Sequence, residues 1–578
     1  MLANAGPVPA RANVCLYSPG PETTPRGAGL DATAVPNERQ LGHFRQILLW
    51  PLQLMPLHEE SQIHRHWEWL EEPRPDNPWR EVDDEFTDDP AGFQQRHYSE
   101  FVTFLPHVQR FLYGEGRSRS GPPGSSPMRV FRRRDIARVR CTYPDSTGLP
   151  PREFDLAHVD LYFFYDLDVV VLNVELHASD ISLDCAQETL FRFGRSYPTY
   201  WEPDGEGGHC LKRADWLDAE GRVLASSDYE QQALFREHVA RNRAPRLAAH
   251  WEYLLRPMVP HHSEVRGPLR YRQLEYHRMP VMAYVALDGD PRRLAPSDFV
   301  RLALVTPSGP AGKMPVSVPD FDTRFCYDRF WVPGSDGPPG SRYMGCGESF
   351  ILLGSARLPY FYTPGGGLLE EFRHQYFLLF LIPHLHKAAL LMMSDRLVYA
   401  LRRLDLQQPD TVKRFKREIR QMREIFLRFT HRYWFHRVSD QIQARDLYRR
   451  TADFLGTEEL YDEVRQRVED MAEYLEEDTT RRQANTVVRL TVVTAFGLIG
   501  TTVTGYFGMN ILGVEGVPAW QRALYFIAIF GGMTWLTFYT VMKSKGLSDF
   551  LDILSDERVT VRDKFRALRA VWRSPGGR

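Results

Sequence analysis

The sequence lacks the short motifs that mark most enzymes, disulfide-linked domains and zinc sites. Its six cysteines are scattered without C-x-x-C spacing, so we expect neither a disulfide framework nor a zinc site, and a reducing compartment is indicated. It contains no P-loop, G-x-G-x-x-G, G-x-S-x-G or H-E-x-x-H pattern. Its net charge of −2 provides no positive excess to attract nucleic acid. The sequence therefore shows none of these enzyme signatures, and we expect no nucleic-acid partner.

The beginning of the sequence also lacks the apolar core of a signal peptide. Residues 1–40 are rich in proline, glycine and alanine. We expect a flexible tail there that stays in the cytoplasm.

Histidine clusters occur, but none has the complete spacing of a metal site. The first cluster is His58, His64 and His66. It lies beside two acidic residues and two tryptophans, yet no second set of metal ligands follows it, so we interpret it as a group of exposed side chains. The later pairs, His261 with His262 and His384 with His386, are equally weak candidates for a metal site.

Residues 41–410 resemble a mixed α/β domain with loop insertions. Two apolar runs between Asp160 and Leu176 flank Tyr165-Asp166-Leu167-Asp168 and predict a β-hairpin. Further strands are predicted at Pro280–Leu287 and Ser349–Leu353.

A helical stalk is predicted next, over residues 411–486. Thr411 to Leu455 is highly charged and has no proline or glycine, and its apolar residues recur at spacings of three and four. Thr457 is a suitable N-cap for a second helix, which we expect to continue to Phe507, about 75 Å away. Its apolar seam suits a helix–helix contact that an isolated chain would leave exposed, which favours an oligomer. The seam consists of Leu460, Val464, Val468, Met471 and Leu475.

Two uncharged runs near the C-terminus, Leu490–Phe507 and Ala523–Met542, are each about as long as a membrane-spanning helix. A short connection makes them a hairpin, and basic residues flank its two free ends, so both termini are expected in the cytoplasm. The predicted fold class is α+β, a cytoplasmic α/β domain followed by stalk helices and a C-terminal transmembrane hairpin. The hairpin divides into a pore-lining span at 487–507, an outer loop at 508–519, a second span at 520–542 and a cytoplasmic tail at 543–578.

A third apolar run, Tyr376–Met393, is expected to be a buried helix of the soluble domain and not a span. Pro383, His384, His386 and Lys387 lie in its middle, where proline and charge are costly in lipid.

The first span differs from the second in chemistry. It holds five threonines and three glycines, whereas the second is bulky and aromatic. Small residues permit close helix packing, and threonine hydroxyls can face water or bond to backbone carbonyls. This composition fits a pore-lining helix, and it also fits two helices that only pack together.

The first span ends in Tyr506-Phe507-Gly508-Met509-Asn510, at the start of the outer loop between the two spans. In this position the sequence resembles the Y-x-G-M-N signature that closes the first transmembrane helix of the CorA magnesium transporters. The resemblance is sharp over residues 460–545 and only architectural over residues 41–455.

The resemblance implies a homopentamer in the inner (plasma) membrane that transports Mg²⁺. Transport involves no covalent step, so the resemblance also implies a protein that is not an enzyme and needs no cofactor. Gly508, Met509 and Asn510 would form the selective outer mouth, where Asn510 would bind the hydrated ion through its waters. Glu473 would lie near the cytoplasmic opening. The residues implied to line the pore between them are Val487, Leu490, Thr494, Leu498, Thr501 and Gly505.

These roles agree with the chemistry of the ion. Mg²⁺ sheds its waters reluctantly, so a ring of asparagine oxygens can bind the hydrated ion by accepting hydrogen bonds from its waters. Rings of Leu and Val can close a pore by dewetting. Within the acidic run before Arg481, Glu473 and either Glu476 or Glu477 are candidates to attract or sense cations, although a solvated helix face is the ordinary interpretation of such a run.

Several features depart from the family pattern. The first span lacks the usual proline, the outer loop holds only Glu515, and the soluble region and C-terminal tail are longer than usual. The tail is either an amphipathic helix on the inner leaflet or stalk, or a solvated segment. Two other functions therefore stay open: a Zn²⁺ (or Co²⁺/Ni²⁺) transporter of the same fold, with or without proton coupling, and a transport-inactive, membrane-tethered regulatory protein.

Overall fold

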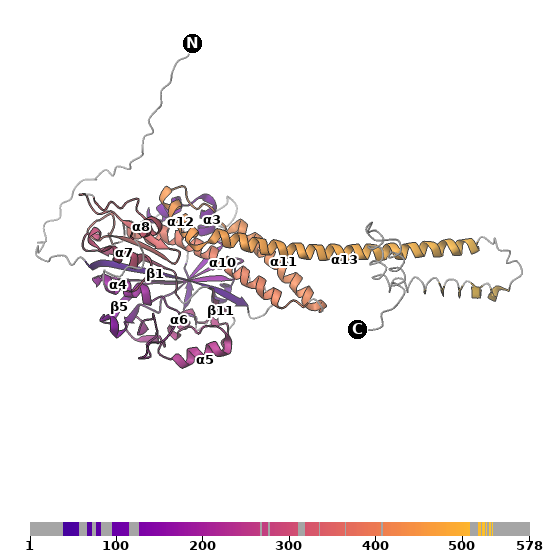
Figure 1. Ribbon diagram of the computed structural model, residues 1–578, viewed down its shortest axis with the longest axis horizontal. Helices are drawn as coiled ribbons and strands as arrows, with labels where there is room; N and C mark the ends of the chain where they lie inside the picture. The colour runs from indigo at the N-terminus through magenta and orange to yellow at the C-terminus, as the bar shows by residue number, and fades with distance from the viewer. Residues whose placement is uncertain are drawn as a thin grey trace, which may run out of the picture.

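The structure is a computed structural model of the chain. It describes residues 39–56, 66–71, 77–82, 95–114, 126–265, 269–274, 278–309, 318–334, 336–364, 366–405 and 408–508, together with short stretches between 518 and 535. A globular α/β part contains most of these residues, and one long helix projects from it (Figure 1).

The globular part is built on one large mixed sheet, whose main path runs β13-β14-β15-β12-β1-β6-β5-β4-β8-β9. Neighbouring strands on this path are antiparallel except β12 and β15, which are parallel. The strands are β1 (Gln40–Pro56), β2 (Trp79–Glu81), β3 (Met128–Arg133), β4 (Arg138–Thr142), β5 (Arg152–Phe164), β6 (Val169–Ala178), β7 (Ile181–Ser182), β8 (Arg213–Leu217), β9 (Val223–Ser226), β10 (Val259–Pro260), β11 (Leu269–Gln273), β12 (Val281–Leu287), β13 (Cys326–Tyr327), β14 (Arg342–Cys346) and β15 (Ser349–Ser355).

Helices cover both faces of this sheet. The α-helices are α1 (Glu68–Glu71), α2 (Gln95–Thr103), α3 (Pro106–Tyr113), α4 (Leu183–Arg192), α5 (Gln232–Asn242), α6 (Ala249–Leu255), α7 (Pro296–Ala303), α8 (Val318–Phe325), α9 (Leu368–Glu371), α10 (Phe377–Arg402), α11 (Pro409–Arg432), α12 (Ile442–Leu455) and α13 (Thr457–Gly508). Two 3₁₀ turns, η1 (Asp145–Thr147) and η2 (Pro291–Arg293), and one π-helical turn, η3 (Phe372–Tyr376), complete the described elements.

Side chains on the central strands alternate between two separate cores. On β12, Val281, Ala283 and Val285 belong to the core that includes α4, α6 and α7, while Met282 and Tyr284 face the core that includes α10 to α13. This two-residue period is what a strand produces when both of its faces are covered. The sheet therefore separates one helical layer from another, and the second layer leads into the projecting helix.

The strands predicted from the sequence are confirmed. β5 and β6 form an antiparallel hairpin in which Val159 pairs with Val174, and the connection places Asp166 in the left-handed region with φ of 63°. Asparagine and aspartate tolerate this region better than most residues. β12 and β15 lie within one or two residues of their predicted bounds.

The apolar run around Pro383 forms the buried helix that was expected. Among the described residues, the helix that is long and apolar enough to cross a membrane is Leu368–Arg402, and 83% of its apolar window is buried inside the molecule. Leu381, Ile382 and Leu385 are at most 1% exposed. The helix is therefore a core element that packs between the sheet and the stalk helices.

The helix expected across Thr411–Leu455 is interrupted, which corrects the prediction. α11 ends at Arg432 and α12 begins at Ile442. Between them, Val438 O accepts a hydrogen bond from Leu105 N at 2.9 Å, and Ser439 Oγ donates to Thr103 O at 2.5 Å. No proline or glycine lies within this break. The segment is non-helical because the corner between α2 and α3, far away in the sequence, binds its backbone and side chain.

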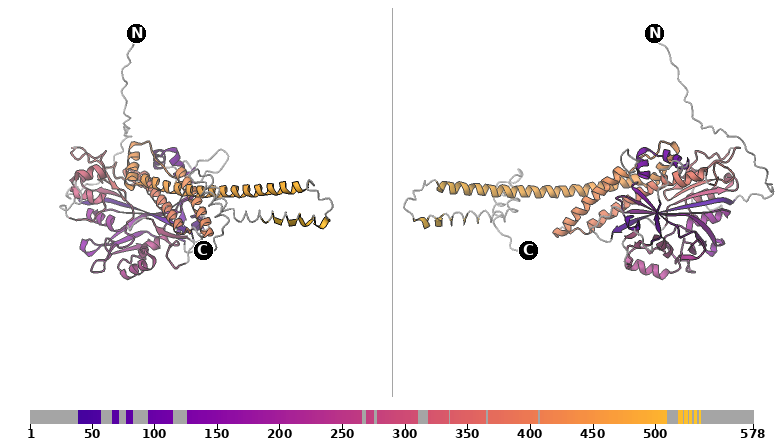
Figure 2. Two further views of the ribbon diagram at one scale, coloured as in Figure 1. Left: turned by 45° about the vertical axis from the view of Figure 1, so that its right-hand side comes forward. Right: turned by 180° about the vertical axis from the view of Figure 1, so that it is seen from behind.

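The long helix expected from Thr457 is confirmed as α13, which runs without interruption to Gly508 and extends away from the globular part (Figures 1 and 2). The apolar seam of α13 was expected to be exposed in a single chain, and the structure corrects this expectation. Val464 and Val468 are 0% and 3% exposed, because the seam packs on α10 and α11 of the same chain. The seam thus has an intramolecular partner and gives no argument for an oligomer.

Candidate ion-conduction pathway

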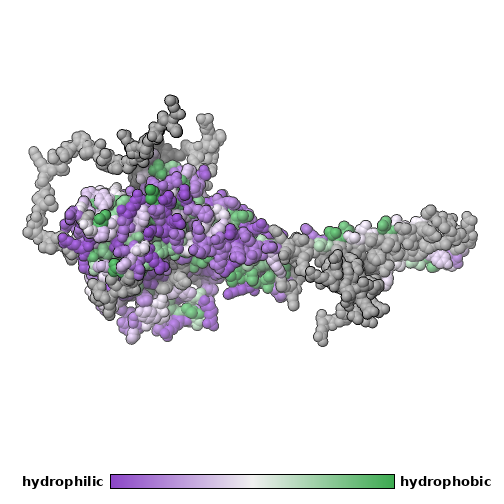
Figure 3. All heavy atoms as spheres, turned by 45° about the horizontal axis from the view of Figure 1, so that its top comes forward, coloured by the Kyte–Doolittle hydropathy of each residue, from purple (hydrophilic) through white to green (hydrophobic). Residues whose placement is uncertain are grey.

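The projecting part of α13 carries the residues that were predicted to line a pore. Val487, Leu490 and Leu498 are 62%, 66% and 69% exposed. Thr494, Thr501 and Gly505 are exposed as well. Such exposure of large apolar side chains over several turns is unusual for a helix in water. Figure 3 shows hydrophobic side chains along this part of the helix, whereas the globular part is mostly hydrophilic at its surface.

These six residues lie on one side of the helix. A residue turns by about 100° around an α-helix axis, so the six positions from Val487 to Gly505 fall within roughly 80° of one another. We call this set the α13 stripe: Val487, Leu490, Thr494, Leu498, Thr501 and Gly505. The structure therefore brings the predicted pore residues onto a common face.

Threonine hydroxyls along this helix donate to backbone carbonyls one turn earlier. Thr494 Oγ1 donates to Leu490 O at 2.7 Å, and Thr501 Oγ1 donates to Gly497 O at 2.8 Å. The hydroxyl proton is satisfied by the helix itself, so the lone pairs of each threonine oxygen face outward as acceptors. A stripe with this chemistry presents acceptor oxygens between apolar side chains.

Glu473 is exposed and lies on the same side of α13 as the stripe, within about 40° of Val487 by helical rotation. The buried seam with Val464 and Val468 lies on roughly the opposite side. Docking of the seam on α10 and α11 therefore leaves this acidic face free of the globular part. Glu469 and Asp470 are exposed beside Glu473.

The outer end of the predicted pathway is described only in part. Gly508 is the last residue of α13 and is exposed, whereas Met509 and Asn510 lie outside the described residues. Of the second predicted span, the described residues between Ala519 and Trp535 are helical. Trp520, Leu524 and Ile527 are 63%, 56% and 68% exposed.

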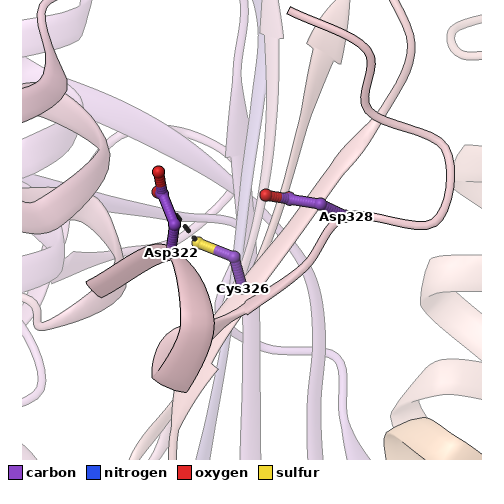
Figure 4. A group of neighbouring side chains, drawn as sticks. All are labelled: Asp322, Cys326 and Asp328. Carbon is purple, nitrogen blue, oxygen red and sulfur yellow. Dashed lines mark hydrogen bonds between the residues drawn. The ribbon is translucent and has the colours of Figure 1, made fainter. Parts of the chain in front are cut away.

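A cluster of potential metal ligands lies in the globular part, far from the stripe. Asp322, Cys326 and Asp328 bring their ligand atoms within 4.8 Å of one another (Figure 4). Arg342 already neutralises both carboxylates, with Nη2 at 2.6 Å from Asp322 and 2.9 Å from Asp328. Burial raises the pKa of the Cys326 thiol to about 12, so the sulfur is protonated at neutral pH and is a poor metal ligand. The cluster has the chemistry of an ion-paired group that ties α8 to β14.

The histidine clusters of the sequence separate in the structure. His66 is buried, and its Nε2 lies 2.5 Å from Asp168, which corrects the expectation that it is exposed; His58 and His64 lie outside the described residues. His384 and His386 are fully buried in α10 and contact the carbonyls of Phe380 and Tyr433. Burial lowers the pKa of His384 to about 4 and that of His386 to about 3, so both are neutral core residues.

Comparison with protein families settles the relationship. Residues 399–543 match the family described as "CorA-like Mg2+ transporter protein". This segment of the chain belongs to the CorA-like family. The match begins at the end of α10, includes α11, α12 and α13, and extends past the Gly508-Met509-Asn510 motif. Comparison of the chain with curated proteins and with solved structures gave no match.

CorA family membership implies transport of divalent cations across a membrane, so the chain is a membrane protein. Members of this family are transporters and channels and not enzymes. The match covers about a quarter of the chain, and most of the α/β part, including β1 to β15, lies outside it.

Sequence reasoning missed the contacts that connect the α/β part of this CorA family member to α13. Arg467 of α13 donates from Nη1 to Ser394 Oγ of α10 at 2.8 Å. Trp434 stacks on Tyr461 of α13 with ring centroids 4.4 Å apart. Each pair joins residues distant in the sequence, so no local pattern identifies it.

Proposed function

We propose that the chain is a homopentameric channel in the inner (plasma) membrane that passes Mg²⁺ down its electrochemical gradient. Five copies of α13 surround the pore, the second span forms an outer ring, and both termini lie in the cytoplasm. The cytoplasmic α/β part gates the channel, and lipid, divalent cations and other copies of the chain are its partners.

The α13 stripe is the main observation that supports this proposal. Its apolar and threonine side chains lie on one face of a helix that has left the globular part, and they are exposed in the single chain. A face that only met lipid would have no use for threonines and glycine at regular intervals between its apolar residues. Around a central axis, the same face supplies alternating dewetting rings and oxygen acceptors for a hydrated ion.

The acidic face below the stripe supports the same arrangement. Glu473 is exposed on the side of the helix that faces the axis when Val487 does. In a five-fold assembly, one inward carboxylate per chain becomes a ring of five. Such a ring concentrates divalent cations at the cytoplasmic opening by electrostatic attraction.

Glycines in α13 provide a second line of support. A Cβ atom added at Gly497, Gly505 or Gly508 would meet no described atom within 4 Å. Nothing in the described part of a single chain therefore requires glycine at these positions. Close approach of another transmembrane helix would require it.

The choice of Mg²⁺ rests on the outer mouth. Asn510 is two residues beyond the end of α13, where five copies would place five amide oxygens around the axis. A neutral ring of acceptors binds the waters of a strongly hydrated ion without stripping them. Carboxylates at this position would bind a divalent ion more tightly and slow its release.

Flux into liposomes tests the proposal. Purified protein is reconstituted, and uptake of Mg²⁺, Co²⁺, Ni²⁺ and Zn²⁺ is measured with and without a pH gradient. We expect Mg²⁺ uptake that needs no pH gradient. Asn510→Ala should reduce Mg²⁺ flux by about tenfold or more, or abolish discrimination among the ions, because the ring of water acceptors is lost.

Asn485→Ala is the matched control, because it makes the same change within α13, about 160° around the helix from Val487. It should leave flux near that of the unmodified protein. Zn²⁺ uptake that depends on a pH gradient would replace the Mg²⁺ channel with a coupled Zn²⁺ transporter. Absence of flux for all four ions in the unmodified protein would support a transport-inactive regulatory protein.

A further inference from the structure

A cleft of about 790 Å³ lies between the sheet, α5, α6 and α10. Tyr271 and Gln273 of β11 line it from the sheet, and Glu252 lines it from α6. Lys387 and Ser394 of α10 form the opposite wall. The cleft thus lies in the α/β part, outside the segment that matches the CorA family, and one of its walls is the helix on which α13 docks.

Unused hydrogen-bond donors concentrate at this cleft. Tyr271 is 0% exposed, and its hydroxyl has no hydrogen-bond partner among the residues that the structure describes. In the same described part of the chain, Gln273 Nε2 and His261 Nδ1 are also buried without a partner. Leaving a buried polar group unpaired costs about 1–3 kcal/mol. Tyr271 and Gln273 together offer donors, so a molecule rich in acceptor oxygens would satisfy them.

The charges around the cleft favour an anion. Arg243 lines it from a left-handed backbone position with φ of 55°, and it forms no ion pair with any described residue. Arg272 is held in place by Gln53 at 2.8 Å and by an ion pair with Asp395. Glu252 is the opposing charge, and burial raises its pKa, which weakens its repulsion of an anion.

Three histidines lie at the rim of the cleft: His238, His261 and His262. The rings of His261 and His262 are 4.7 Å apart, and those of His238 and His262 are 6.4 Å apart. Burial and the neighbouring positive charges lower the pKa of His238 and His261, so these rings are neutral near pH 7. Arg243 and Arg272 make the site unfavourable for a cation, although imidazoles are good metal ligands.

We propose that this cleft binds a small oxyanion, a molecule that presents a phosphate or carboxylate group to Arg243, Tyr271 and Gln273. Arg243 supplies the charge-assisted contact, and the two buried donors supply orientation. Phosphate and carboxylate share the planar edge of acceptor oxygens that a guanidinium group binds. The rest of the ligand occupies the space toward α5.

The cleft is connected to the proposed pore helix through contacts of α10. Ser394 lines the cleft and also accepts a hydrogen bond from Arg467 of α13 at 2.8 Å. A ligand in this cleft therefore shares its site with a helix, α10, that contacts α13 directly. This regulatory part of the inference rests on the proposed channel function, whereas binding of the anion does not.

Binding is tested by calorimetric titration of the full-length, detergent-solubilised protein with inorganic phosphate, pyrophosphate and citrate, in the absence of divalent metal. At least one of these probes should bind. Arg243→Gln should weaken binding by about tenfold or more, and Arg243→Lys, which keeps the charge, should lose less. Glu252→Gln should tighten binding by about threefold or more because a repelling carboxylate is removed.

Arg241→Gln is the matched control, because Arg241 lies on α5 outside the cleft lining and pairs with Glu237 at 2.9 Å. It should bind like the unmodified protein. Equal losses in the Arg241→Gln and Arg243→Gln variants would reveal unspecific surface attraction and overturn the proposal. So would the absence of binding by all three probes at millimolar concentration, or binding of Zn²⁺ at the histidines in place of an anion.

Regulation is tested separately in liposomes. Inorganic phosphate on the side of the α/β part should change the Mg²⁺ flux of the unmodified protein, and Arg467→Ala should reduce that change by about threefold or more while phosphate still binds. If no variant conducts any ion, the channel proposal fails but the binding result stands. If flux is present and indifferent to a bound anion, the regulatory inference fails alone.

Discussion

Glu175 on β6 is held between two arginines inside the globular part. Arg45 of β1 forms an ion pair with it, and Arg373 of η3 reaches the same carboxylate at 2.9 Å. Burial alone would raise the pKa of Glu175, but the two guanidinium groups outweigh it and lower the pKa to about 2. This residue therefore ties the sheet to the turn that precedes α10.

Replacement of Glu175 by glutamine should destabilise the protein by about 3 kcal/mol, because Arg45 stays buried without this counter-charge and Arg373 keeps its longer pair with Glu370 at 3.4 Å. The pH dependence follows from the lowered pKa. The folded protein keeps the carboxylate ionised, so its contribution is complete above the unfolded value of about 4.3 and is lost as the pH falls toward 2. Unfolding by denaturant at a series of pH values measures both effects.

Glu237→Gln is the control for this measurement. Glu237 pairs with Arg241 on the surface, where both side chains are more than 60% exposed, and such pairs contribute about 1 kcal/mol or less. A loss of stability at Glu175→Gln no larger than the control, or an unchanged acid limb, would contradict the assigned role. This cluster could not be predicted from sequence, since Arg45 and Arg373 lie 130 and 198 residues away from Glu175.

At the scale of elements, the docking of α13 depends on its seam. Val464 is 0% exposed between α10 and α11. Val464→Ala should cost about 2 kcal/mol, from the lost apolar contact and the cavity that remains. Gln466→Ala, two residues away on the exposed side, should change stability by less than about 0.5 kcal/mol. The melting temperature of the detergent-solubilised chain measures the difference, and equal values for the two variants would show that the seam is not packed.

The elements that periodicity could predict are those whose burial is repeated along the sequence. The β5–β6 hairpin follows from two apolar runs around a turn, the buried α10 from an apolar run with proline and charged groups in its middle, and the uninterrupted α13 from the absence of helix-breaking residues. The break between α11 and α12 could not be predicted, because contacts from Thr103 and Leu105 cause it. The seam of α13 could be recognised from its spacing, but its packing partners α10 and α11 could not, because these contacts join distant parts of the sequence.

The candidate pore-lining residues were likewise predictable only in part. The stripe from Val487 to Gly505 could be placed on one face from spacing alone, once the helix was known to be continuous. The threonine hydrogen bonds and the position of Glu473 relative to the docked seam could be seen only in the structure. Asn510 stays a prediction, since it lies outside the described residues.

At the scale of the whole molecule, the stripe predicts how copies of the chain meet. Val487→Cys should form disulfide-linked dimers in membranes under oxidising conditions, because stripe residues of neighbouring copies converge on the axis. Val492→Cys makes the same change about 140° around the helix and should form few or none. Non-reducing gel electrophoresis compares the two, and native mass spectrometry of the unmodified protein should give a mass of five chains. A monomer in both experiments would rule out the assembly.

The length of α13 has a mechanical consequence. Its 52 residues span about 78 Å, and none of them is a proline, the commonest cause of a sharp kink. Among the described residues, Val464 and Val468 anchor it near its first end. From these valines to Gly508 the helix is about 60–66 Å long, so a rotation of about 5° at the anchored end displaces Gly508 by roughly 5–6 Å. Sub-ångström adjustments in the packing of two valines are therefore amplified at the far end of the helix.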